Sequence, residues 1–85
     1  MSAPSDAELR RLLLAALGQV APEADLAALR PGAVLRDELE IDSIDVLNLA
    51  IALHDATGLD IPERDYAELA TLERGVAYLR RRLGG

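Results

Sequence analysis

Residues 5–20, SDAELRRLLLAALGQV, decide the fold class of this chain of 85 residues. Ser5 and Glu8 have the spacing of a capping box, the reciprocal arrangement of side chains that begins many helices. Pro22 follows closely and cannot continue the interior of a helix. Between these signals, apolar residues recur at the three- and four-residue intervals of one helix face: Leu9, Leu12, Leu13, Ala16, Leu17 and Val20. The sequence therefore predicts an amphipathic helix over residues 5–20.

A second long helix is predicted over residues 43–57. Asp42 precedes it as a good N-cap, which places Ser43 in the first helical position. Gly58 follows it and is suited to a left-handed helix end. The face that this helix buries is predicted from its apolar residues, a stripe of Ile44, Leu47, Ala50 and Ile51 widened by Val46, Leu49 and Leu53.

The rest of the chain predicts two more helices and one long connection. Residues 61–69 predict a short third helix with Pro62 in its first position, and Thr71 caps a fourth helix that ends near Leu83. Residues 21–41 form the connection, with one helical turn expected over residues 23–29 and apolar residues that place it against the helices. We expect an all-α fold, a small four-helix bundle with a long first loop and a short third helix.

One domain is expected over residues 1–85, with its core at about 5–83 and flexible ends at 1–4 and 84–85. Leu and Ala supply 32 of the residues, whereas Phe, Trp and Cys are absent, so a disulfide framework and a cysteine nucleophile are excluded. The net charge of −6 is unsuited to binding nucleic acid. No apolar run approaches a membrane span, and we expect a cytoplasmic monomer.

Ser43 is the hydroxyl residue for which the sequence offers no structural role. Ser5 and Thr71 are explained as caps, Thr57 by its place at a helix end and Ser2 by its place in a terminus expected to fray, whereas Asp42 already caps the helix that Ser43 begins. The start of a helix favours an anion, so a phosphate attached to Ser43 would be well placed there. A solvated serine in a first helical turn remains the simpler interpretation of this residue taken alone.

Self-contained catalysis is excluded by the spacing of the titratable residues. His54, the single histidine, lies eleven residues from Ser43, about 16 Å along one helix and far beyond hydrogen-bond reach. An EF-hand loop that began at Asp37 would need Gly and Glu where Asp42 and Asn48 stand. We therefore expect neither catalytic residues nor a metal site, although the acidic residues leave a weak divalent-cation patch open.

The stretch LEIDSID at residues 39–45 resembles the D-S-L motif of acyl carrier proteins, with Ile44 in the Leu position. The GLDIP stretch at residues 58–62 is similar to the G-x-x-I-P link of that family, and residues 71–79 are similar to its last helix. D-S-[LI] alone is a weak pattern, but the spacing, length and acidity agree as well. The resemblance extends from about Leu9 to Leu83.

The resemblance implies that Ser43 is the attachment point of 4′-phosphopantetheine, with Asp42 as the adjacent motif residue. A phosphopantetheinyl transferase would add the group from coenzyme A, and its thiol would carry acyl groups as thioesters. The protein would then be a carrier, not an enzyme, with an acyl ligase or acyltransferase and acyl-processing enzymes as further partners. Their basic faces would dock on acids around the serine, for which we expect Asp37, Glu38, Asp42, Asp45 and Asp55.

The distribution of charge agrees with such a docking face, because residues 37–68 hold ten acids against one base, a balance of −9, and the remainder holds five against eight, a balance of +3. Glu40 departs from the family, in which many members have Gly, and Asn48 and His54 replace acids that are common there. Fatty acid synthesis and a specialised lipid or polyketide pathway both stay open. The alternatives are a peptidyl or aminoacyl carrier and an unmodified helical adaptor that binds a protein through its acidic helix.

Overall fold

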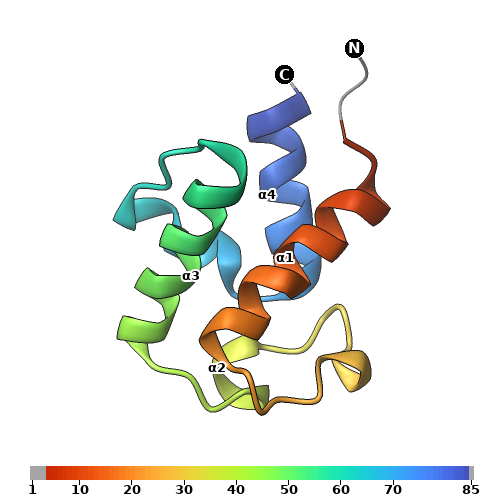
Figure 1. Ribbon diagram of the computed structural model, residues 1–85, viewed down its shortest axis with the longest axis vertical. Helices are drawn as coiled ribbons and strands as arrows, with labels where there is room; N and C mark the ends of the chain where they lie inside the picture. Colours follow the sequence, from red (N-terminus) through yellow and green to blue (C-terminus); the bar gives the residue numbers. More distant parts are fainter. Residues whose placement is uncertain (1–3, 85) are drawn as a thin grey trace.

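The computed structural model describes residues 4–84, and its elements are helical (Figure 1). They are α1 (Asp6–Val20), the 3₁₀ turn η1 (Leu26–Ala28), α2 (Leu35–Glu38), α3 (Ser43–Thr57), the 3₁₀ helix η2 (Glu63–Leu69) and α4 (Leu72–Gly84). This confirms the predicted all-α bundle with a long first loop and a short third helix. Within residues 4–84, no helix combines the length and the apolar character needed to cross a bilayer.

The predicted flexible ends fall mostly outside the described residues. Residues 1–3 and 85 are not described, Pro4 precedes the cap of α1, and Gly84 is the last residue of α4.

The α1 helix is the centre of the packing. The predicted capping box is confirmed, because the Glu8 amide donates to Ser5 Oγ at 3.2 Å and the Ser5 amide donates to Glu8 Oε1 at 3.1 Å. Its buried residues are Leu9, Leu13, Ala16 and Leu17. It crosses α4 and also packs against α3, so both helices share one aliphatic core with it (Figure 1).

The long connection lies against the bundle, as predicted. It contains η1 inside the expected helical turn, and also α2, a four-residue helix that the sequence did not predict. Its Leu35 side chain is buried and the Leu35 amide donates to Ala70 O at 2.8 Å. The Glu73 amide donates to Pro31 O at 2.9 Å. The first bond ties α2 to the end of η2, and the second ties the connection to the start of α4.

The predicted buried face of α3 is partly wrong. Leu49, Ala50 and Leu53 are buried as expected, and Ala52 joins them. Ile44, Leu47 and Ile51 are instead 67%, 44% and 49% exposed. Apolar residues surround most of this helix, so their spacing alone fits more than one buried face, and contact with α1 selects the side that carries Leu49 and Leu53.

Polar side chains fasten η2 to α4. Glu68 accepts hydrogen bonds from Arg74 Nη2 at 2.8 Å and Arg81 Nη2 at 2.7 Å, and these donors hold the pKa of its carboxyl below the usual value. The buried Tyr78 donates its hydroxyl to Asp65 Oδ2 at 2.8 Å, and burial, followed by this bond, raises the pKa of Tyr78. The prediction that Pro62 is the first residue of the third helix is wrong, because Pro62 is the N-cap of η2.

Candidate functional site

The start of α3 is organised by two carboxylates. Asp42 is its N-cap, as predicted, and its Oδ1 accepts from the amides of Ile44 and Asp45, each at 3.1 Å. Asp45 Oδ2 accepts from the Asp42 amide at 3.1 Å, which completes a second capping box. The pair satisfies free amides at the helix end and fixes the backbone of the two residues between them in sequence, Ser43 and Ile44.

Ser43 is the first residue of α3, and its side chain is exposed. The other hydroxyls of Ser and Thr within residues 4–84 have structural partners: Ser5 and Thr71 cap helices, and Thr57 Oγ1 bonds Leu53 O and the Leu59 amide. Over the same residues, the Ser43 hydroxyl has no hydrogen-bond partner. It is therefore free to react with a molecule brought from outside.

His54 lies on the same helix as Ser43, close to its far end, so the structure keeps the two residues apart. Its Nδ1 atom is 2.9 Å from Leu59 O and 3.4 Å from Asp60 Oδ1, so it faces the link between α3 and η2. The histidine closes the end of α3 and is not a base for Ser43.

Glu40, in the link between α2 and α3, has a left-handed backbone with φ 53°. An L-residue in this conformation is strained by roughly 1–2 kcal/mol, whereas glycine adopts it freely. The residue thus carries the sharp turn that leads the chain from α2 to Asp42.

Glu40→Gly is expected to raise the free energy of unfolding by up to about 1 kcal/mol, because relief of the left-handed strain exceeds the entropy that glycine gains on unfolding. Urea denaturation followed by circular dichroism measures this as a higher midpoint at an unchanged slope. Glu38→Gly is the matched control, since Glu38 lies in α2 and glycine there costs about 1 kcal/mol. A Glu40→Gly protein as unstable as the control would contradict the prediction.

A cavity of about 600 Å³ opens beside Ser43, between α3 and η2. Its wall is mostly aliphatic, with Ile41, Leu47 and Leu49 on one side and Leu69 on the other. Arg36, Glu63 and Tyr66 are, with Ser43, its polar or titratable residues. The arrangement offers an apolar recess next to the exposed hydroxyl.

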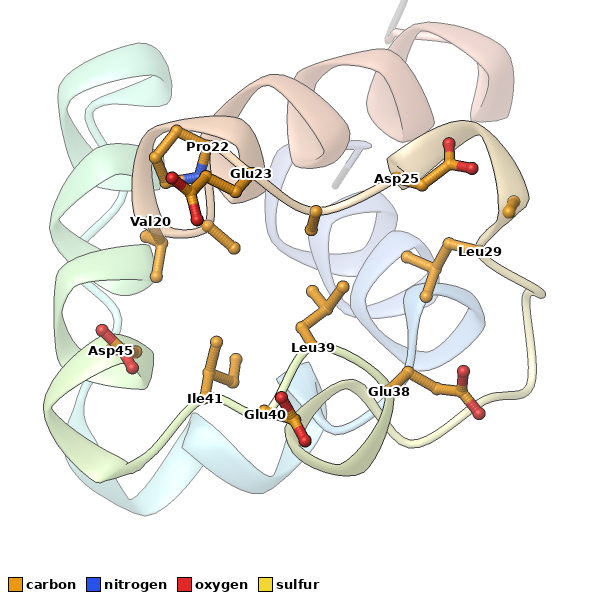
Figure 2. A pocket seen from close by; sticks show the side chains of 13 residues that line it. Val20, Pro22, Glu23, Asp25, Leu29, Glu38, Leu39, Glu40, Ile41 and Asp45 are labelled. Carbon is orange, nitrogen blue, oxygen red and sulfur yellow. The ribbon is translucent and has the colours of Figure 1, made fainter.

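A second hollow, of about 560 Å³, lies between the end of α1, the connection and the start of α3 (Figure 2). Leu39 and Ile41 rise into it in Figure 2, and Asp45 faces it from α3. Its acidic lining residues are Glu23, Asp25, Glu38, Glu40 and Asp45. Among residues 4–84, no three His, Cys, Asp or Glu side chains gather closely enough to hold a metal ion. This hollow therefore has an acidic lining and lies next to the end of α3 that carries Ser43.

The five acids expected to dock partners lie at two places. Asp37 and Glu38 are exposed on α2, and Asp42 and Asp45 cap α3, so four of them surround its start. Asp55 is exposed near the other end of α3. The sequence did not predict the exposed apolar surface of α3 that runs between its two ends. The outer stripe, defined here as Ile44, Leu47, Ile51 and Asp55, follows one helix face by its spacing of three, four and four residues.

Comparison with known proteins agrees with this geometry. The family described as "Phosphopantetheine attachment site" matches residues 7–79. An acyl carrier protein of Rubrobacter xylanophilus is 34% identical over 55 residues, which cover 65% of this chain and 68% of that protein. An acyl carrier protein of Rhodococcus erythropolis is 31% identical over 74 residues, which cover 81% of this chain and 79% of that protein.

Proposed function

The chain belongs to the acyl carrier protein family, and from this premise we propose that Ser43 carries 4′-phosphopantetheine and that the arm holds acyl groups as thioesters. The observation that carries the proposal is the exposed Ser43 hydroxyl, which alone among the Ser and Thr hydroxyls of residues 4–84 has no structural partner. Carrier proteins of this family are not themselves catalytic.

The chemistry of attachment needs only a nucleophile from this chain. The Ser43 oxygen attacks the phosphorus of coenzyme A that bears the pantetheine, and a new phosphorus–oxygen bond forms. The pyrophosphate bond breaks, and adenosine 3′,5′-bisphosphate leaves. The serine proton passes to a base of the transferase, because His54 lies near the other end of α3. Asp42 and Asp45 hold the helix start that presents the hydroxyl.

The residues around Ser43 fit the group and its cargo. The hydroxyl provides the point of attachment, and the apolar cavity between α3 and η2 lies beside it. Bonds of Glu68 and Tyr78 hold η2 against α4. We therefore expect α3, and not η2, to move when an acyl chain enters this cavity. Alkyl groups suit an aliphatic wall, whereas the ammonium of an aminoacyl group would lose hydration there. This favours an acyl cargo over an aminoacyl one.

Incubation with coenzyme A and a broad-specificity phosphopantetheinyl transferase, followed by intact mass measurement, tests the proposal. The chain should gain the mass of one phosphopantetheinyl group. Acyl and aminoacyl ligases are then offered to the modified protein, and we expect loading by the acyl ligase. No gain in mass would favour the helical adaptor, and loading by the aminoacyl ligase alone would favour the aminoacyl carrier.

Partner enzymes of lipid or polyketide-type synthesis are proposed to dock on the outer stripe and on the acids at its two ends. Ile44, Leu47 and Ile51 expose apolar surface that an interface core can bury. Asp37 and Glu38 at one end and Asp55 at the other supply the negative charge that steers a basic face. Apolar contact would then set the stability of the complex, and charge would set the rate of encounter.

Asp37→Lys and Asp55→Lys are each expected to lower kcat/KM of the transferase about tenfold or more at low salt, because each reverses charge on the docking side. Glu73→Lys is the matched control, an equal charge change at an exposed residue of α4 outside residues 37–68. Steady-state rates at low and high ionic strength measure the effect, which should shrink with salt. Equal losses for Glu73→Lys and Asp55→Lys would place the docking face elsewhere.

A further inference from the structure

The phosphodiester on Ser43 would enter a site that already holds negative charge. The Asp42 and Asp45 carboxylates lie at the same helix start, and Asp42 occupies the amides of Ile44 and Asp45. Those amides are the donors that would otherwise attract an anion at a helix N-terminus. The start of α3 is therefore less favourable to a phosphate than the sequence predicted, and a cation nearby would offset the repulsion from the two carboxylates.

Arg36 is the basic residue among those that line the cavity beside Ser43. It lies on α2, which the bond from the Leu35 amide to Ala70 O anchors to the end of η2. Over residues 4–84, the Arg36 guanidinium has neither a salt bridge nor a side-chain hydrogen bond, whereas Arg74, Arg80, Arg81 and Arg82 all have acidic partners. The Arg36 side chain is exposed and available to bind an anion at the cavity.

Guanidinium groups suit phosphates because their planar donors bind two oxygens at once. Glu63 lines the same cavity and adds an acidic side chain to it. With Asp42, Asp45 and Glu63 negative around the attachment point, Arg36 supplies the opposite charge from a separate element.

We propose that Arg36 binds the phosphodiester that joins the pantetheine arm to Ser43. It is a positioning residue, which fixes where the arm leaves the protein surface. The inference rests on the proposed function, since the phosphate is present only after Ser43 is modified. Arg64 provides a matched control, because it is an exposed arginine like Arg36 but lines a different cavity, with Asp60 and Asp65.

The experiment compares the modified forms of the wild type, Arg36→Gln, Arg36→Lys and Arg64→Gln. Intact mass first shows that each variant carries the arm, so a failure of the proposed function is seen separately from a failure of this inference. The readouts are the ³¹P chemical shift of the phosphodiester and the difference in Tm between modified and unmodified protein. Neither readout depends on a partner enzyme.

Arg36→Gln is expected to move the ³¹P shift toward its value in the urea-unfolded protein. The same variant should lower the Tm of the modified form relative to the unmodified form by about 2–4 °C, which corresponds to loss of one exposed ion pair in a domain of this size. Arg64→Gln should behave as the wild type, and Arg36→Lys should recover part of both effects. Identical ³¹P shifts in the wild type and Arg36→Gln, or equal changes in Arg36→Gln and Arg64→Gln, would overturn the inference.

Discussion

Ser43→Ala is expected to abolish phosphopantetheine attachment completely, and with it every thioester that the protein could carry. The substitution removes the hydroxyl oxygen that we propose attacks coenzyme A. The Ser43 hydroxyl has no hydrogen-bond partner within residues 4–84, and its backbone is fixed by Asp42 and Asp45. The variant should therefore fold with a stability within about 0.5 kcal/mol of the wild type. Loss of loading with an unchanged circular dichroism spectrum and Tm separates a chemical role from a structural one.

Ser5→Ala is the control for this experiment. Ser5 is also an exposed serine at a helix start, but its Oγ caps α1. Its removal should cost about 1 kcal/mol of stability and leave attachment intact. The two serines should thus show opposite effects. Loading of Ser43→Ala at the wild-type rate would contradict the assignment.

Leu13→Ala is expected to cause the largest loss of stability. Leu13 is 0% exposed in the core that α1 shares with α3 and α4. Removing a buried leucine side chain costs about 2–5 kcal/mol, and a domain of this size has only about 5–15 kcal/mol in total. Its Tm should fall by 10 °C or more, at about 4–8 °C per kcal/mol. Differential scanning calorimetry gives the value, and Leu14→Ala, at a half-buried position, should cost less.

Substitutions at Gly75 on α4 test whether Leu13 packs closely against this helix. A Cβ atom at Gly75 would lie 2.7 Å from Leu13 Cδ2, so the two helices approach where glycine leaves room for the leucine. Gly75→Ala should therefore destabilise the wild type through overpacking. In the Leu13→Ala background the same change should instead stabilise by about 1 kcal/mol, because alanine is the better helix former. A favourable effect in both backgrounds would show that the contact is not restrictive.

The sequence predicted the parts of the fold that local signals specify. Ser5, Asp42 and Thr71 begin helices where capping rules place them, and Gly58 ends α3 in the left-handed conformation with φ 77°. The four-residue α2 was missed because it is too short for a periodic pattern and has no capping side chain. This helix is held by tertiary contacts instead, such as the bond from the Leu35 amide to Ala70 O.

For the site, elimination left Ser43 as the hydroxyl without a structural role, and the family resemblance predicted the arm there, but the sequence could not place what surrounds this residue. The outer stripe was expected to be buried, because the spacing of Ile44, Leu47 and Ile51 is the same for a buried and an exposed face. The sequence did not predict that Arg36 and Ser43 line the same cavity. The link between α2 and α3 brings them together, and its direction depends on the left-handed backbone of Glu40. Tertiary packing decides both points.

Locating the arm tests whether it is attached to one residue. After incubation with coenzyme A and transferase, the protein is digested and its peptides are fragmented in a mass spectrometer. We expect a single modified peptide, with the phosphopantetheinyl group on Ser43. A group found on Ser2, Ser5, Thr57 or Thr71, or no modified peptide at all, would contradict the proposed attachment site.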